Sequence, residues 1–182
     1  MNSPSEKEMS VFSEKLNRLW REQKMKEAKM LLLAEVEKYP DEYFLWTSLA
    51  QTCSRLGEYV SALAFSTKAI EICDDDVLVL YNHVTALIET ESYNEALPFC
   101  QQILEKDVVS IAQNGEGLRW TKSIRNDTLY LKAVALFRLG EFALALSILK
   151  HLLNMRERGV YSDFTKKQIL NIIKAIEGLS NM

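Results

Sequence analysis

Residues 43–76 read YFLWTSLAQTCSRLGEYVSALAFSTKAIEICDDD, and this stretch decides the fold class. Apolar residues recur at helical spacing through 43–56, and the same spacing resumes from Tyr59 to about Cys73. Gly57-Glu58 stands between the two runs, and glycine suits the left-handed residue that commonly ends a helix. The stretch therefore predicts two helices joined by a tight turn.

The same pattern recurs along the chain with a fixed period. Ala28, Ala62 and Ala96 are each 34 residues apart, and Ala145 follows 49 later. Other columns keep these offsets, namely Phe12, Trp46, Leu80 and Leu129, and Leu19, Cys53, Leu87 and Leu136. Because repeats decide an architecture before single residues do, we expect four helix pairs, at 9–42, 43–76, 77–110 and 126–159. The longer step implies an insertion at 111–125.

The alanine columns explain how such pairs pack. A small residue lets the second helix approach the first closely, and stacking of neighbouring pairs buries the faces that one pair leaves open. The stack then needs a terminal helix with one polar face, and residues 163–178 fit, with isoleucines on one side and lysines elsewhere. Ser162 or Asp163 is the expected cap of that helix. We predict a single all-α domain over 1–182, a right-handed α-solenoid of helix-turn-helix units with a C-terminal capping helix.

Composition excludes several classes of function. The 182 residues carry a net charge of -3, so there is no basic excess to neutralise nucleic-acid phosphates. No apolar run is long enough to span a membrane, and residues 1–10 lack the apolar stretch of a secretory signal. The cysteines stand at no metal-ligand spacing, which is typical of buried thiols in a reducing compartment. We expect a cytoplasmic protein without nucleic-acid or membrane partners.

Residues for chemistry are sparse. His83 falls in a column of core residues, which predicts a buried or half-buried imidazole, and His151 has no partner at metal-ligand spacing. Asp74-Asp75-Asp76 lacks the alternating ligands of a calcium loop and is better explained as a helix cap. No motif places a nucleophile beside a base. The sequence predicts neither a cofactor, nor a metal, nor a catalytic site.

These features resemble the tetratricopeptide repeat. The best match is 43–76, where Trp46, Leu49, Ala50, Gly57, Tyr59, Ala62 and Ala69 fall at the motif's spacing. Two units depart from the motif, since Gln23 and Glu91 stand where its turn glycine is usual. The resemblance implies the helical repeat fold, whereas the fold alone says little about a specific task.

The resemblance also implies a partner-binding groove lined by the first helix of each pair. The corresponding positions are Asn17, Trp20, Arg21, Thr47, Gln51, Arg55, Tyr81, Asn82, Thr85, Tyr130, Phe137 and Arg138. Aromatic rings, amides and guanidinium groups together suit a peptide or a partner protein. The alternative is that the aromatic members only pack against neighbouring helices.

One subfamily is excluded by its motif. Co-chaperone modules that bind a chaperone's C-terminal carboxylate use a clamp of Lys, Asn, Asn, Lys and Arg on successive units. Over the first three units only Asn17 agrees with the clamp, and over the last three only Asn82 agrees.

The insertion has two interpretations. Gly115 and Gly117 would permit a turn, after which 118–125 would lengthen the next helix, with Leu118, Trp120 and Ile124 packed on the third unit. Alternatively the insertion contacts a partner, through Glu116, Arg119, Trp120 and Arg125. Without a preceding strand or a following Gly-Lys-Ser/Thr, the glycines do not make a phosphate loop.

The sequence thus predicts a non-catalytic protein-interaction module, an adaptor or a partner-specific chaperone, that binds a protein or peptide on a concave face. The alternative is a self-associating structural protein that forms a homo-oligomer through exposed apolar residues.

Overall fold

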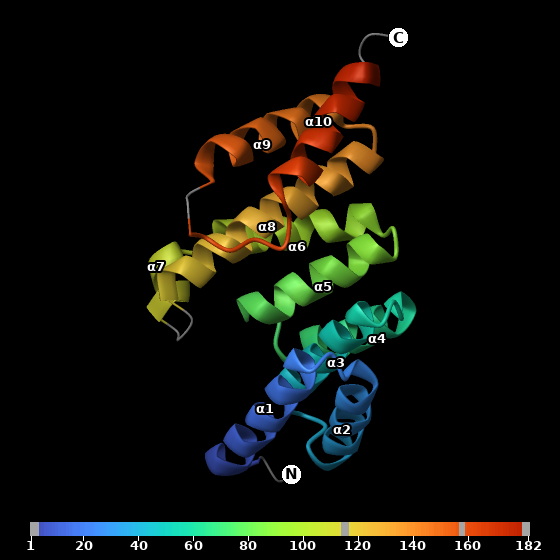
Figure 1. Cartoon of the computed structure of the whole chain (residues 1–182), viewed down its shortest axis with the longest axis vertical. Helices are drawn as coiled ribbons and strands as arrows, with labels where there is room; N and C mark the ends of the chain where they lie inside the picture. The colour runs from blue at the N-terminus through green and yellow to red at the C-terminus, as the bar shows by residue number, and fades with distance from the viewer. Residues whose placement is uncertain (1–3, 114–116, 157–158, 180–182) are drawn as a thin grey trace. The chain divides into compact units, whose positions relative to one another are not determined.

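The computed structural model describes residues 4–113, 117–156 and 159–179, and within these ranges it contains helices and no strand (Figure 1). The helices are α1 Glu6–Arg21, α2 Met25–Lys38, α3 Tyr43–Arg55, α4 Tyr59–Ile72, α5 Val77–Glu89, α6 Tyr93–Glu105, α7 Val108–Ile111, α8 Gly117–Arg138, α9 Phe142–Met155 and α10 Lys166–Leu179. The chain divides into two compact units, Met1–Thr90 and Glu91–Met182. The all-α class predicted from the helical periodicity is confirmed.

The first unit packs α1 to α5 in chain order, with each helix against the next. Its core includes Leu16, Ala28, Leu32 and Leu49, which are fully buried. At the start of α1, Ser5 and Glu8 form a capping box that satisfies backbone N–H groups at the helix terminus. The predicted cap of α5 is confirmed at Asp76, whose carboxylate accepts from two backbone N–H groups. The alanine column therefore serves close helix packing, as expected.

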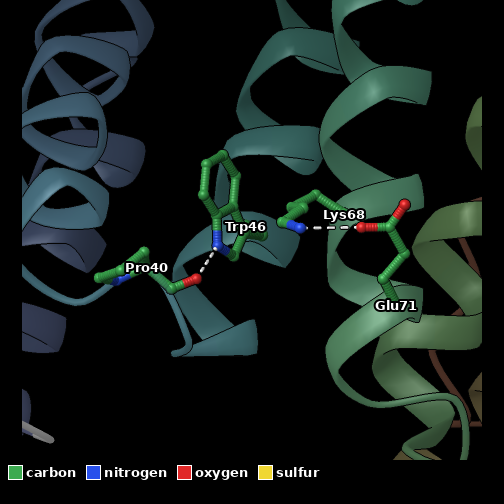
Figure 2. Close-up of polar contacts among 4 residues, drawn as sticks. All are labelled: Pro40, Trp46, Lys68 and Glu71. Atoms are coloured by element: carbon green, nitrogen blue, oxygen red, sulfur yellow. Dashed lines mark hydrogen bonds and ion pairs between the residues drawn. The ribbon is translucent and has the colours of Figure 1, made fainter. Parts of the chain in front are cut away.

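Trp46 fixes the entry to α3. Its indole Nε1 donates a hydrogen bond of 2.7 Å to the carbonyl oxygen of Pro40, in the turn between α2 and α3 (Figure 2). Its ring lies 6.0 Å from the ring of Phe65 on α4. On the exposed side of α4, Lys68 and Glu71 form a 2.8 Å ion pair one helical turn apart (Figure 2). One tryptophan thus joins the turn and two helices.

The second unit is organised around α8, which contacts α6, α7, α9 and α10. At 22 residues α8 is long because residues 117–125 are helical, so the expectation that 118–125 lengthen this helix is confirmed. Leu118 is 50% exposed, so its predicted packing was wrong, whereas Ile124 is buried.

A left-handed residue ends the first helix of each pair. The positive φ angles are 59° at Gln23, 76° at Gly57, 61° at Glu91 and 83° at Gly140. These positions keep the offsets of the sequence repeat, 34, 34 and 49 residues. The turn geometry therefore recurs even where the motif's glycine is replaced, at a cost in backbone strain. The assignment of the whole chain to one domain of four repeats stays a prediction.

The last helix begins later than expected, at Lys166. Thr165 caps it, because the Thr165 hydroxyl accepts from the backbone N–H of Gln168 while the Gln168 side chain accepts from the backbone N–H of Thr165. The prediction that Ser162 or Asp163 caps this helix was wrong, since both residues bind α8 instead. The apolar side of α10 is confirmed: Ile169, Ile173 and Ile176 are buried.

Among the residues that the structure describes, no helix has both the length and the apolar composition needed to cross a membrane.

Candidate partner-binding surfaces

A hollow of about 1010 Å³ opens beside α1 in the first unit. It is lined by Val11, Glu14, Lys15, Asn17, Arg18, Trp20, Arg21 and Arg55. Four of these, Asn17, Trp20, Arg21 and Arg55, were predicted for the groove from the repeat columns. The structure therefore brings together groove candidates that lie more than 30 residues apart in sequence, and we call this site the α1 hollow.

Trp20 is held in place from two sides. Its indole Nε1 donates a 3.1 Å hydrogen bond to the hydroxyl of Thr52, and that hydroxyl donates 2.7 Å to the carbonyl oxygen of Ser48. The guanidinium carbon of Arg55 lies 5.4 Å from the centre of the indole ring, within the range of a cation–π contact. Trp20 also packs against the core cluster of the first unit. Trp20 is thus a rigid aromatic wall of the α1 hollow.

Positive charge dominates the α1 hollow. Lys15, Arg18, Arg21 and Arg55 line it, against the single carboxylate of Glu14. The Nε of Arg21 donates a weak 3.4 Å bond to a backbone carbonyl one turn earlier on α1. Guanidinium groups bind carboxylates with two parallel hydrogen bonds, so this lining suits an acidic ligand.

A smaller hollow of about 490 Å³ shares Lys15 and Arg18 with the α1 hollow and extends to Glu22, Lys24 and Glu27. Its charges are mixed, and Glu22 and Lys24 pair with each other at 2.8 Å. The pKa of Glu22 is lowered, chiefly by the hydrogen bond that it accepts from Lys24. Because its ions neutralise one another, this surface has less to offer a charged ligand than the α1 hollow does.

Three of the predicted groove residues on α3 and α5 donate hydrogen bonds to carbonyl oxygens of their own helices. The hydroxyl of Thr47 donates to the carbonyl of Tyr43 at 2.8 Å, and Thr85 donates to Tyr81 at 2.9 Å. The side-chain amide of Asn82 donates to the Leu78 carbonyl at 2.8 Å. Thr47 and Asn82 are buried, whereas Gln51, Tyr81 and Thr85 are half-buried. None of these five lines the α1 hollow, and their part in binding stays a prediction.

The aromatic groove candidates on α8 pack against other residues of the second unit. Tyr130 is buried and stacks on Phe164, with ring centroids 4.0 Å apart. Phe137 meets the ring of Phe142 at 5.8 Å. Arg138 lies 3.5 Å from the carboxylate of Glu91 and over the ring of Tyr93. A partner would reach the ring of Tyr130 only after Phe164 had moved away.

The candidates in the insertion are dispersed. Glu116 lies outside the described residues. Arg119 is exposed and Trp120 is half-buried. Nη1 of Arg125 donates at 3.2 Å to the carbonyl of Lys106, at the end of α6. Arg125 therefore has a structural contact within the second unit, and a binding role for the insertion stays a prediction.

Residues 159–165, in the connection between α9 and α10, form contacts that the sequence did not predict, and we call them the strap. The Ser123 hydroxyl donates to the carbonyl of Tyr161 at 2.5 Å. The carboxylate of Asp127 accepts from the Ser162 hydroxyl and, at 3.2 Å, from the backbone N–H of Asp163. The one available signal was Asp127 itself, an acid two residues before the apolar run Leu129–Leu131 of α8. Its pKa is raised from 3.8 to about 6, mainly by burial.

The buried titratable groups of the first and second units favour their neutral forms. Burial raises the pKa of Cys53 to about 11 and that of Cys100 to about 12, which keeps both thiols protonated at neutral pH. His83 is buried as predicted, its Nδ1 lies 2.9 Å from the Ser66 hydroxyl, and burial lowers its pKa. Within the described ranges, His, Cys, Asp and Glu form no group of three or more that could hold a metal ion.

Solved structures share this fold. A tetratricopeptide repeat protein from Parabacteroides merdae superposes with a TM-score of 0.63 at 18% identity, over 94% of this chain and 61% of that one. The chain has the tetratricopeptide repeat fold. MamA from Desulfovibrio magneticus RS-1 matches at 0.63 and 14% identity over 94% of both chains, and MamA AMB-1 at 0.63 and 15% over 94% and 82%. No protein-family model matches the sequence, and neither does any curated protein.

In the tetratricopeptide repeat fold, α1, α3, α5 and α8 are the first helices of their pairs. They carry all the residues predicted for the groove. The predicted class, an all-α solenoid of helix-turn-helix repeats with a terminal helix, is confirmed. Of these helices, α1 lines the cationic α1 hollow.

Proposed function

We propose that this chain is a non-catalytic protein-interaction module that binds an acidic segment of a partner protein in the α1 hollow. The observation that carries the proposal is the gathering of Trp20 and Arg55 with three further cations around one concavity. In this proposal the chain acts as an adaptor or a partner-specific chaperone in the cytoplasm.

In this proposal the Trp20 ring binds an apolar side chain of the partner, and the arginines bind its carboxylates. Trp20 is already fixed by Thr52 and by core packing, so little rotamer freedom is lost when a ligand covers its ring. Buried Trp and Arg side chains dominate the energetics of many interfaces. Arg18, Arg21 and Arg55 would bind carboxylates, and the indole would receive an apolar side chain between them. The expected ligand is an extended segment with acids flanking one large apolar residue.

A random decapeptide display library tests this chemistry without assuming a partner. The intact chain should enrich peptides with a net negative charge around a single Phe, Leu or Trp. The variant Arg18→Ala/Arg21→Ala/Arg55→Ala should lose that acidic preference. Arg119→Ala is the matched control, since it removes an exposed cation from α8, and it should leave the enrichment unchanged.

Two results would contradict the proposal. One is an enriched set with no excess of Asp and Glu. The other is an acidic preference that the triple variant retains. Trp20→Ala should weaken binding of the selected peptides by at least about tenfold, because it removes a central aromatic anchor.

Self-association is the second candidate, favoured by exposed apolar side chains on α9 and α10. Leu144 is 56% exposed, Met155 50%, Leu170 44% and Leu179 49%. A second copy could cover such side chains. Light scattering across a dilution series separates the candidates, because a strict monomer at every concentration removes this one and leaves the α1 hollow unaffected.

A further inference from the structure

The strap contacts one face of α8 at three successive positions. Ser123, Asp127 and Tyr130 are spaced four and three residues apart, so they lie in one row along the helix. Their strap partners occur in the same order, first Tyr161, then Ser162 with Asp163, then Phe164. Figure 1 shows the orange-to-red connection between α9 and α10 running beside α8. The contact is therefore in register over about two helical turns.

Each contact on this face uses a group that an unrelated extended peptide could also supply. The Tyr161 backbone contributes a carbonyl oxygen, and the Asp163 backbone contributes an N–H. Phe164 contributes a ring, stacked on Tyr130 with 23° between the planes. Tyr161 is 72% exposed, and its hydroxyl donates at 2.8 Å to the carboxylate of Asp163 within the strap. Recognition thus depends on two backbone groups, one hydroxyl and one aromatic ring.

We propose that the α8 face is a second peptide-binding surface, which the strap occupies as an internal ligand and from which a partner segment of similar chemistry can displace it. The partner segment presents a Ser hydroxyl and, two residues later, a Phe ring, in the spacing of Ser162 and Phe164. This binding mode joins main-chain hydrogen bonds to one side-chain anchor, as other peptide-recognition surfaces do.

The strap's tether explains why the face is closed at rest. A ligand in the same chain has a high effective concentration, so a free peptide competes only during the fraction of time that the strap is detached. The neighbouring helices do not need to unfold for detachment, because α10 has its own cap at Thr165 and its own buried isoleucines. The strap should therefore open in a local step.

Hydrogen exchange on the unaltered protein tests the local step. The amide of Asp163, which donates to Asp127, should exchange at least 100-fold faster than the amides at the centre of α8, and its rate should depend little on urea. Exchange of Asp163 that matches the α8 amides in both rate and urea dependence would overturn the proposal, because the strap would then open only with the whole unit.

Peptide binding in trans tests the surface itself. The probe is a fluorescein-labelled peptide of residues 159–167, Gly-Val-Tyr-Ser-Asp-Phe-Thr-Lys-Lys. The full chain carrying Ser162→Ala/Phe164→Ala should bind it at least ten times more tightly than the unaltered chain, and adding Tyr130→Ala should abolish the gain. Leu144→Ala is the matched control, since it removes an exposed apolar side chain of α9 and leaves the strap unaltered; it should bind the probe no better than the unaltered chain.

A folded Ser162→Ala/Phe164→Ala variant that fails to bind the probe at about 1 mM overturns the proposal. Where circular dichroism shows that this variant is unfolded, Ser162→Ala alone replaces it and the exchange measurement decides. The inference is independent of the α1 hollow: Arg18→Ala/Arg21→Ala/Arg55→Ala should leave probe binding unchanged. A failure of either proposal is therefore distinguishable from a failure of the other.

Discussion

Helix α1 of the first unit and helix α8 of the second unit differ in what covers them. On α1, Trp20 and its cationic neighbours line an open hollow. On α8, Tyr130 lies beneath Phe164 of the strap, and Asp127 is sequestered by strap hydrogen bonds. Both helices hold the first position of a helix pair, and both carry residues predicted for the same groove. A few residues of connection decide whether such a face is exposed.

Equivalent positions in the repeat therefore do not have the same function. Tyr130 aligns with Thr47 and Tyr81 in the repeat, yet one is stacked under another ring and one bonds to its own helix. Their shared position fixes the face of the helix. The neighbours of each residue then fix whether that face packs, binds or bonds to itself.

The largest expected effect comes from removing the covered ring. Tyr130→Ala should lower the free energy of unfolding by about 3 kcal/mol, because a buried aromatic side chain leaves a cavity and loses its stacked partner. Tyr130→Phe keeps the ring and should stay within about 0.5 kcal/mol of the unaltered protein. Urea unfolding followed by circular dichroism gives both values. Equal losses for the two variants would show that the ring is not the source of the stability.

Asp127 should make the second unit pH-dependent. Its pKa is raised from 3.8 to about 6, first by burial; the hydrogen bonds from Ser162 and from the Asp163 N–H lower it, the charge of Asp163 raises it and that of Arg156 lowers it. The folded state therefore holds the proton more tightly than the unfolded state, so stability falls as pH rises through this window. One pKa unit is worth about 1.4 kcal/mol, so the loss by pH 7 is at most about 3 kcal/mol.

Asp127→Asn isolates that dependence. Asn keeps an oxygen for the N–H of Asp163 and has no proton to lose, so its stability should lack this fall between pH 4 and pH 6. The quantity to measure is the difference in unfolding free energy between the two proteins at each pH, which cancels contributions from other groups such as His83. A constant difference across the window would contradict the role assigned to Asp127.

The turns that end the first helices allow a comparison, within each unit, of the stability cost of a left-handed residue with and without glycine. The expected effects are smaller than those at Tyr130 and Asp127. Gln23 and Glu91 hold left-handed conformations that glycine adopts without strain, so Gln23→Gly should stabilise by about 1 kcal/mol. Gly57→Ala and Gly140→Ala should destabilise by about the same amount. A Cβ at either glycine would meet nothing within 4 Å, so the effect is backbone strain alone. Melting temperatures measure it, and an unchanged value for Gln23→Gly would show that its turn is unstrained.

The smallest effect on stability is expected in the α1 hollow. Arg55 is exposed and contacts Trp20 only through a cation–π interaction, which is worth about 0.5–1 kcal/mol at such sites. The free energy of unfolding of Arg55→Ala should therefore lie within about 1 kcal/mol of that of the unaltered chain. The same variant should bind the selected acidic peptides more weakly. A large loss of stability together with unchanged binding would reverse the assignment of this residue from ligand contact to packing.

The sequence predicted the fold well because periodicity reports burial directly. The alanine column and the turns are local signals, and α1 to α6, α8 and α9 follow them, whereas the short helix α7 was not predicted. The position of α8 was also foreseeable, since residues 118–125 continue a helical pattern into the fourth pair.

The site was predictable only in part, because it depends on contacts between distant residues. Trp20 and Arg55 could be placed on first helices, but the cation–π contact joins two helices across 35 positions. The strap left no periodic signal, since an irregular segment of seven residues has no period to detect. Ser162 and Asp163 were taken for caps because Ser and Asp favour helix starts, and only the fold shows that they bind α8.

The central claim is that the unaltered chain receives an acidic partner on α1 while the strap keeps α8 closed. Amide hydrogen exchange of the intact protein, with and without a peptide selected from the library, tests it most directly. With the peptide bound, we expect slower amide exchange within residues 11–21 and 52–55 and no change over 123–130 or 159–165. Protection on α8, or faster exchange of the strap with α1 unchanged, would contradict it.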